Sequence, residues 1–152
     1  MNARARVSRA RAFFKDARGS KTMAINSQFQ ATRFCWVDLA ATDAVGAAEF
    51  YRGLFGWQTR TQHTNGGEFK RFMAGDETVA SLYQLDARQI AAGVPSHWTP
   101  YVEVADIDES AARAGTLGGS LVVKPFDVDG MARVSLVSDS CGALIGLWEH
   151  AK

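Results

Sequence analysis

The pattern of hydrophobic and polar positions changes period along the chain, and each change predicts an element. Residues 34–39 are rich in aromatic and β-branched side chains, which is typical of a strand. Apolar residues at helical spacing then run from Ala47 to Phe55, after the N-cap signal Thr42-Asp43 and before Gly56, and predict a helix. Three short strands are predicted after it, separated by glycine-containing turns, at residues 57–64, 68–73 and 79–85.

A second stretch repeats this order after the breaker segment 93–95. It predicts a strand at 98–104, a helix capped by Asp106 or Asp108, and strands at 121–123, 132–137 and 143–148. The spacing is also repeated, because eleven positions separate Asp43 from Leu54 and Asp106 from Leu117. Each β-α-β-β-β unit of about 55 residues is too small to bury its sheet alone. We therefore expect an α+β fold in which modules 31–90 and 96–150 pair sheet to sheet around one shared core or cavity, within a single domain 31–150.

Composition narrows the class of protein. The 152 residues are 47% hydrophobic and 22% charged, which excludes disordered and fibrous chains. No apolar run is long enough to cross a bilayer, so no membrane partner is expected. Cys35 and Cys141 are too few for a disulfide scaffold or a thiolate zinc site and favour a reducing, cytoplasmic location, although one bridge stays open.

Charge is distributed unevenly. Residues 1–22 carry a net charge of +6 and residues 23–152 a net charge of −5, so the folded part offers no basic face for nucleic acid. The basic segment fits a transit peptide, a tether to nucleic acid or membrane, or a solvated tail. We favour a disordered tail over residues 1–30, with Met23 as a candidate native start.

Both halves together resemble a known family. The residues that carry the resemblance are Trp36-Val37-Asp38-Leu39, Thr42-Asp43, Phe50-Tyr51, Leu54-Phe55-Gly56-Trp57, Tyr101-Val102-Glu103-Val104-Ala105-Asp106, Leu117-Gly118-Gly119 and Gly142-Ala143. This ordered set resembles the vicinal oxygen chelate superfamily, which includes glyoxalase I, bleomycin-resistance proteins and extradiol dioxygenases. The resemblance implies an incomplete eight-stranded barrel, with a ligand cleft lined by the inward faces of the strands.

The metal-binding members of that superfamily take their ligands from the first and last strands of each module. In this chain those places fall on Trp36 (or Phe34 if the register shifts by two), near Ser81, on Thr99 and on Gly146. A divalent metal needs three or four N, O or S donors, and these places offer no imidazole or carboxylate. We therefore predict that the chelate site has been lost and that no metal or cofactor is bound.

Three titratable residues are candidates for proton transfer. Asp38 and Glu103 occupy matching places in the two modules, and two carboxylates meeting in a partly apolar cleft can carry out acid–base chemistry. The alternative is that each binds turn amides or a neighbouring base at a strand end. His97 lies on the same strand side as Thr99 and is the remaining candidate for a metal or proton role, although a hydrogen-bonded strand-end histidine is the simpler interpretation.

Aromatic residues dominate the predicted cleft. Strand alternation points Phe34, Trp36, Tyr101 and Trp148 into it, and places Cys35, Val37, Val102 and Val104 beneath the helices. Such a cleft suits a flat apolar or aromatic small molecule, but the same rings also serve as core filling.

These observations predict a homodimer that binds a small apolar or aromatic metabolite without metal. The expected ligand-binding residues are Phe34, Trp36, Ser81, Thr99, Tyr101, Gly146 and Trp148. One alternative is a metal-free isomerase, lyase or hydrolase that uses Asp38, Glu103 or His97 as acid–base groups. Another is a metal-dependent lyase of the glyoxalase type, with an unusual site built on His97 and Glu103.

Overall fold

The computed structural model describes residues 32–64, 67–128 and 130–151. The described elements follow the predicted order: β1 (Phe34–Ala41), α2 (Ala44–Phe55), β2 (Gln58–Thr64), β3 (Gly67–Ala74), β4 (Glu77–Gln84), α3 (Ala87–Ala91), β5 (His97–Glu103), α4 (Ile107–Thr116), β6 (Ser120–Val128), β7 (Ala132–Ser138) and β8 (Leu144–His150). The tail predicted over residues 1–30 lies outside the described residues. No helix within the described ranges is long and apolar enough to span a membrane.

Helix α2 begins and ends at the residues that the sequence predicts. The Asp43 carboxylate accepts a hydrogen bond from the Gly46 backbone N–H at 2.9 Å, and Gly56 adopts the left-handed conformation with φ of 74°. At α4 the cap is Asp106 rather than Asp108, because the Asp106 carboxylate accepts from the Glu109 backbone N–H at 2.8 Å. The N-cap prediction is therefore confirmed in both modules.

Replacing Asp43 by alanine is expected to lower the free energy of unfolding by about 1 kcal/mol, because the first turn of α2 loses the acceptor for its free N–H group. For a chain of this size the melting temperature falls by about 2–4 °C per kcal/mol. Thermal melts followed by circular dichroism measure the loss. The matched control Asp43→Ser keeps a capping oxygen and should melt within about 1 °C of the parent; equal losses in both variants would contradict the capping role.

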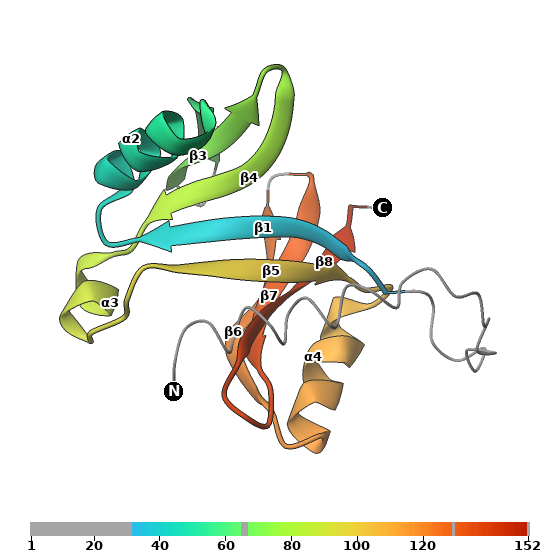
Figure 1. Ribbon diagram of the computed structural model, residues 1–152. Coiled ribbons are helices and arrows are strands. Elements are labelled where there is room, and N and C mark those ends of the chain that lie inside the picture. The colour runs from blue at the N-terminus through green and yellow to red at the C-terminus, as the bar shows by residue number, and fades with distance from the viewer. Residues whose placement is uncertain (1–31, 65–66, 129, 152) are drawn as a thin grey trace, which may run out of the picture.

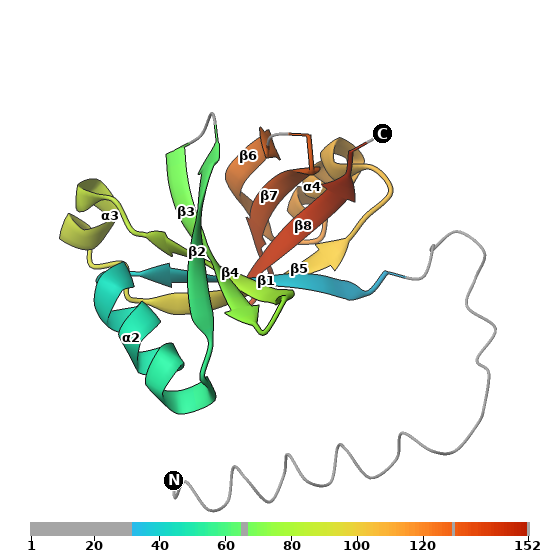
Figure 2. The ribbon, with the colours of Figure 1, turned by 90° about the horizontal axis from the view of Figure 1, so that it is seen from above.

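The two modules share one sheet. Its strand order is β2-β3-β4-β1-β5-β8-β7-β6, and the modules join edge to edge through the antiparallel pair β1 and β5. The expected sheet-to-sheet pairing is therefore wrong: the first strand of each module pairs with that of the other, which leaves the hairpins of both modules at the outer ends. Figures 1 and 2 show that the sheet curls, with the β2–β3 arm and the β6–β8 arm rising on the same side of the central pair β1 and β5. The predicted incomplete barrel is confirmed.

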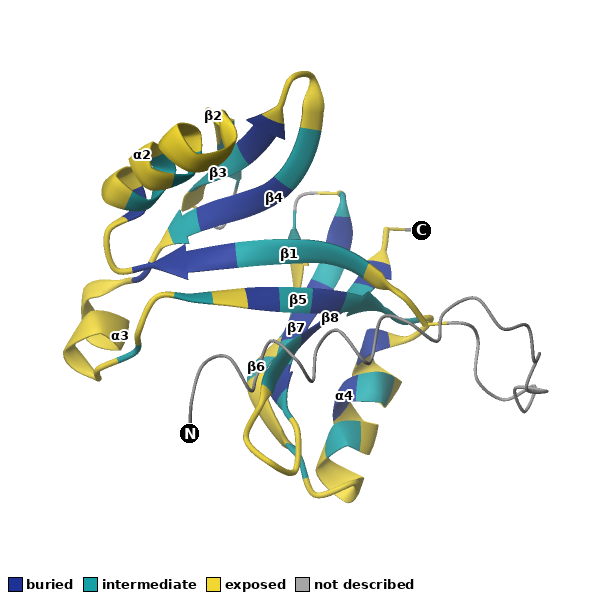
Figure 3. Cartoon of the chain, in the orientation of Figure 1, coloured by how far each residue is buried: buried dark blue, intermediate teal, exposed yellow. Residues whose placement is uncertain are grey.

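The two long helices, α2 and α4, each cover the half of the outer sheet face that belongs to their own module. Beneath α2 lies a core that includes Leu39, Phe72 and Leu82, whereas Ile107 and Ala111 of α4 pack against Val137 and Leu147. Figure 3 shows the first of these as buried positions along β3, β4 and β1. The outer face of the sheet thus carries two helix-covered cores, one beneath α2 and one beneath α4.

A third cluster lies on the inner face and is the one that both modules build. Its buried members are Tyr101, Ala132 and Val134, and Cys35, Trp36, Val128, Leu136 and Trp148 pack against them at its rim. Residues paired across neighbouring strands point to the same side of a sheet. Trp36 pairs with Tyr101, and Tyr101 pairs with Gly146, so this aromatic row crosses β1, β5 and β8 on one face.

A β-bulge in β1 corrects two of the side-chain directions predicted from alternation. Trp36 pairs with Tyr101, but Phe34 pairs with Val102, so Cys35 is an extra residue in the strand. The bulge turns Phe34 to the face of Val102, where it is 69% exposed, and removes it from the predicted ligand-binding set. Cys35 instead packs in the inner cluster, with its Sγ 3.6 Å from the Tyr101 carbonyl oxygen.

Helix α3 was not predicted, because its five residues are too few to show an apolar period. Its signal is a capping box: the Asp86 carboxylate accepts from the Gln89 backbone N–H, and the Gln89 side chain accepts from the Asp86 backbone N–H. The helix bridges the two modules between β4 and β5.

Both modules anchor their long helix in the same way, which supports the internal repeat. In the first, the Gln84 side-chain oxygen at the end of β4 accepts from the Ala44 backbone N–H of α2 at 2.9 Å. In the second, the Glu149 carboxylate near the end of β8 accepts from the Ile107 backbone N–H of α4 at 3.0 Å. Each helix N-terminus is thereby tied to the last strand of its own module.

Candidate functional site

A polar row crosses the inner face where the two modules meet. Asp38 on β1 pairs with Ser81 on β4 and with Thr99 on β5, so all three side chains point to the same side as the aromatic row. Thr99 is almost completely buried, and its hydroxyl has no hydrogen-bond partner among the described residues. The register therefore brings Trp36, Ser81, Thr99, Tyr101 and Gly146 together, as the sequence predicts.

The Asp38 carboxyl is the centre of this site. The Trp36 indole N–H donates to Asp38 Oδ1 at 2.8 Å and also lies 2.7 Å from Ser81 Oγ, and the Ser81 hydroxyl donates to the same Asp38 oxygen. Burial raises the pKa of Asp38 above its ordinary value of 3.8, although hydrogen bonds from Ser81, Tyr101 and Trp36 oppose that rise. A buried carboxyl surrounded by donors can hold or release a proton at this point.

Two tyrosines complete the surroundings of Asp38. Burial and the negative charge of Asp38 raise the pKa of Tyr101 and of Tyr83 above the ordinary tyrosine value of 10.0. Both phenols thus stay protonated near neutral pH, and the Tyr101 hydroxyl donates a hydrogen bond to Asp38. Tyr83 is absent from the predicted set, although it lies two positions after Ser81 on β4 and period-two alternation places it on the same face.

The place of a fourth metal ligand is filled by an aromatic ring. A Cβ atom at Gly146 would lie within 2.5 Å of three atoms of the Tyr101 ring, so only glycine leaves room for that ring. Indole, hydroxyls and a glycine do not make a donor set for a divalent ion. Within residues 32–64, 67–128 and 130–151, no three His, Cys, Asp or Glu side chains are grouped closely enough to hold a metal. The residues at the chelate positions do not fit a metal ion.

The structure separates the three acid–base candidates. Glu103 lies four residues beyond Thr99, the partner of Asp38, so about 13 Å of strand separates the two carboxylates. Glu103 accepts from Arg33 Nε at 2.9 Å and lies 3.6 Å from His150 Nε2, which is the strand-end ion-pair arrangement. His97 Nδ1 lies 2.8 Å from the Pro95 carbonyl oxygen at the start of β5. Glu103 points to the same face, because it pairs with Trp148, but it lies at the far end of the aromatic row. Of the three candidates, only Asp38 is hydrogen-bonded to Trp36 and Ser81.

Aromatic rings form a continuous floor beside Asp38. Trp36 and Trp148 have ring centroids 6.1 Å apart at an interplanar angle of 35°, and Trp148 meets Tyr101 edge to face at 6.1 Å. These are ordinary distances for attractive ring contacts, and a flat ligand can stack on the same surfaces. We call Trp36, Tyr101 and Trp148 the aromatic floor.

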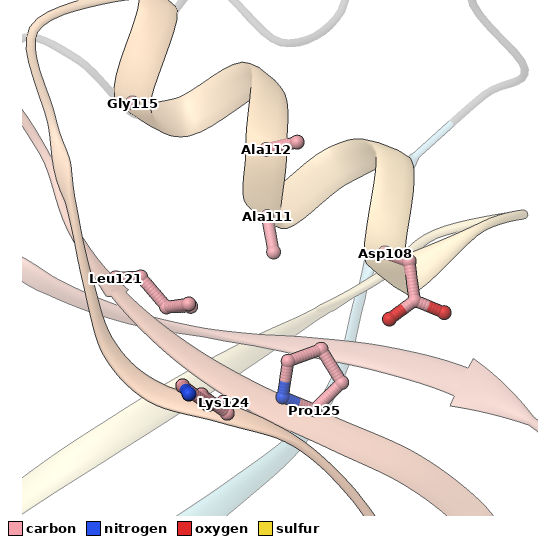
Figure 4. Close-up of a pocket in the computed structure, with 7 residues that line it drawn as sticks. All are labelled: Asp108, Ala111, Ala112, Gly115, Leu121, Lys124 and Pro125. Atoms are coloured by element: carbon pink, nitrogen blue, oxygen red, sulfur yellow. The ribbon is translucent and has the colours of Figure 1, made fainter.

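Two hollows lie away from Asp38. A hollow of about 560 Å³ separates α4 from β6 and is lined by Asp108, Ala111, Ala112, Gly115, Leu121, Lys124 and Pro125. Figure 4 shows the Ala111 side chain of α4 pointing toward Leu121 and Pro125, with Asp108 at one end. A second hollow lies around Arg133 and Glu149. Neither contains a residue predicted for the site, and neither is lined by a tryptophan, tyrosine or phenylalanine side chain.

Comparisons with known proteins agree with this architecture. The sequence profile of the Glyoxalase/Bleomycin resistance protein/Dioxygenase superfamily matches residues 33–147. The anthracycline biosynthesis protein DnrV of Streptomyces peucetius is 32% identical over 124 residues, which cover 74% of this chain and 45% of that protein. The glyoxylase-like protein CFP32 of Mycobacterium tuberculosis is 32% identical over 116 residues, covering 75% and 44%. The chain thus spans about half the length of the curated relatives it matches.

Solved structures give the same fold at lower identity. Methylmalonyl-CoA epimerase from Mycobacterium tuberculosis has a TM-score of 0.55 and 18% identity, covering 78% of this chain and 88% of that one. The hypothetical protein BH1468 from Bacillus halodurans C-125 has a TM-score of 0.57 and 16% identity, covering 81% and 97%. These likenesses establish the arrangement of strands and helices and leave the chemistry to the site.

Proposed function

Because this chain belongs to the Glyoxalase/Bleomycin resistance protein/Dioxygenase superfamily, we propose that it binds a small, flat, apolar or aromatic molecule on the inner face of the sheet, without a metal. The observation that carries the proposal is the aromatic floor next to a hydrogen-bonded, partly buried carboxyl. Rings supply apolar surface and stacking, while Asp38, Ser81 and Tyr83 supply a few polar groups that orient a ligand. Relatives named for anthracycline biosynthesis agree with a role in handling small molecules.

Metal-free binding follows from the donor chemistry of the chelate positions. Trp36, Ser81, Thr99 and Gly146 offer no imidazole or carboxylate, and Tyr101 occupies the space above Gly146. A ligand is therefore held by stacking and hydrogen bonds. The homodimer and the cytoplasmic location stay predictions from the sequence.

A test uses a neutral flat probe, 2-naphthamide, with binding measured by isothermal titration calorimetry. Replacing Trp148 by leucine is expected to weaken binding about tenfold, which corresponds to about 1.4 kcal/mol, because one ring of the floor is lost. The control Phe50→Ala removes an exposed ring from α2 on the outer face and should leave the affinity within twofold. Equal weakening in both variants, or no binding by the parent, would contradict the proposal.

A second candidate function is metal-free proton transfer by Asp38. It is favoured by the burial of this carboxyl, which raises its pKa toward the range in which general acids and bases work. Glu103 and His97 lie outside the Asp38 site, so Asp38 acts alone with Ser81 and the tyrosines as donors. An enzyme of this kind would lose turnover of its substrate on Asp38→Asn while still binding it. A protein that only sequesters its ligand would show no turnover in either form and would keep its affinity.

A further inference from the structure

Arg71 of β3 is a cation in the same polar row as Asp38. It pairs with Ser81 on β4, and Ser81 pairs with Asp38 on β1, so the three side chains start from the same face of the sheet. Two strand spacings of about 4.8 Å place the backbones of Arg71 and Asp38 about 10 Å apart. Arg71 is thus positioned at the wall of the inner face, beyond the aromatic floor.

The Arg71 guanidinium reaches across the open side of the curled sheet. Its Nη2 lies 3.1 Å from the sulfur of Met131, a residue 60 positions away that directly precedes β7. Figure 2 shows that β3 and β7 belong to the two arms that rise from the central pair of strands. Arg71 and Met131 therefore connect the two arms above the inner face.

Arg71 lacks the carboxylate partner that five of the seven arginines described by the structure have. Five others form an ion pair with a carboxylate: Arg33, Arg52, Arg60, Arg113 and Arg133. Arg71 is partly buried, and none of the carboxylates that the structure describes pairs with it; its contact is a thioether, which is a weak acceptor. A guanidinium has five donors arranged to bind a carboxylate through two parallel hydrogen bonds, so most of this binding capacity is unused.

From this arrangement we propose that the ligand carries a carboxylate, which Arg71 binds while the apolar or aromatic body lies on Trp36, Tyr101 and Trp148. This inference rests on the proposed function and adds the chemical class and the orientation of the ligand. The ionised Asp38 carboxylate repels an anion at the floor, whereas the Arg71 guanidinium attracts one at the wall. The charge distribution therefore places the anionic end of the ligand beside Arg71 and Met131.

The experiment compares two probes of the same shape, 2-naphthoate and its neutral amide 2-naphthamide, by titration calorimetry at pH 7.5 in low salt. The parent protein is expected to bind the naphthoate at least tenfold more tightly than the amide. Arg71→Gln should weaken naphthoate binding at least tenfold and change amide binding less than twofold. Arg71→Lys keeps the charge but not the paired donors, and should retain an intermediate preference.

Arg60→Gln is the matched control. Arg60 is the cross-strand partner of Arg71 on β2, but its guanidinium lies 3.8 Å from the exposed Asp76 carboxylate. Its loss should leave the naphthoate preference within twofold of the parent, and melting temperatures of all variants verify that each is folded. An equal loss of the naphthoate preference in Arg60→Gln and Arg71→Gln would show that the preference comes from the overall positive charge of the surface, and would overturn the inference.

The remaining outcomes separate the inference from the function on which it rests. Binding of the amide with no preference for the naphthoate overturns the role of Arg71 and leaves the proposed function standing. Binding of neither probe contradicts the proposed function and the inference with it. If the parent prefers the naphthoate, and Arg71→Gln removes this preference without changing the affinity for the amide, the result supports both the inference and the proposed function.

Discussion

Replacing Gly146 by alanine is expected to lower the free energy of unfolding by about 3 kcal/mol, at the upper end of the usual cost of overpacking. The new methyl group would lie within 2.5 Å of three atoms of the Tyr101 ring, and that ring is only 5% exposed. Tyr101 is held between Trp148 and the Asp38 carboxyl and cannot swing away without breaking the inner cluster. The expected fall in melting temperature is about 6–12 °C, measured by calorimetry or circular dichroism.

Gly53→Ala provides the control for this substitution. Gly53 lies in α2, nothing lies within 4 Å of the position of an added Cβ, and alanine there should stabilise the helix by about 0.5–1 kcal/mol. The double variant Tyr101→Ala/Gly146→Ala should lose less stability than the sum of the two single variants, because the clash disappears with the ring. If Gly146→Ala melted like Gly53→Ala, the packing of Tyr101 on Gly146 would be refuted.

Replacing Asp38 by asparagine is expected to raise the melting temperature at neutral and alkaline pH. Burial raises the pKa of Asp38 in the folded protein above its ordinary value of 3.8, so the folded state binds the proton more tightly than the unfolded chain. The ionised carboxylate consequently reduces stability at high pH, and this cost disappears as the pH falls through the raised pKa. Asparagine keeps the oxygen that accepts from Trp36 and Ser81 and carries no charge.

The stability difference between the Asp38→Asn variant and the parent should therefore be widest at pH 9 and close as the pH approaches 3.8. Asp108→Asn provides a control of opposite sign. A hydrogen bond from Arg133 lowers the pKa of the exposed Asp108 carboxyl, so its ionised form stabilises the fold at neutral pH and that small contribution is lost on acidification. An Asp38→Asn variant that is less stable than the parent at every pH would show that the carboxylate is favoured in the fold.

Local signals in the sequence predicted all the strands and both long helices but not α3, and the resemblance to a known family indicated the fold. Asp43 and Gly56 bound α2 as predicted, and the repeated spacing around Asp106 identified the second module, because capping and amphipathic periodicity act within a few residues. Edge-to-edge joining through β1 and β5 was not predicted, because the order of strands in a sheet depends on contacts between residues far apart in the chain.

The candidate site was predictable where alternation holds and not where it breaks. Four of the predicted residues share one face of the sheet as expected: Trp36, Ser81, Thr99 and Tyr101. The bulge at Cys35 turns the Phe34 side chain to the other face, and no residue type in β1 predicts a bulge. The sequence around Arg71 contains no motif that predicts a ligand-binding role. That role was inferred only once the structure placed the Arg71 guanidinium against Met131, 60 positions away. Asp38 and Glu103 seemed equivalent in sequence, but one is buried and the other is tied to Arg33 at a strand end.

Both modules contribute to the inner cluster, and this limits how the protein can diverge. Trp36 and Cys35 come from the first module, and Tyr101, Val134 and Trp148 from the second, so these side chains also hold the halves of the molecule together. A substitution that reshapes the floor for a new ligand must therefore weaken the joint between the halves as well. Arg71, Tyr83 and Met131 are not members of this cluster, so a change of specificity at these positions leaves its packing intact, although a change at Arg71 or Met131 removes the contact between the two arms.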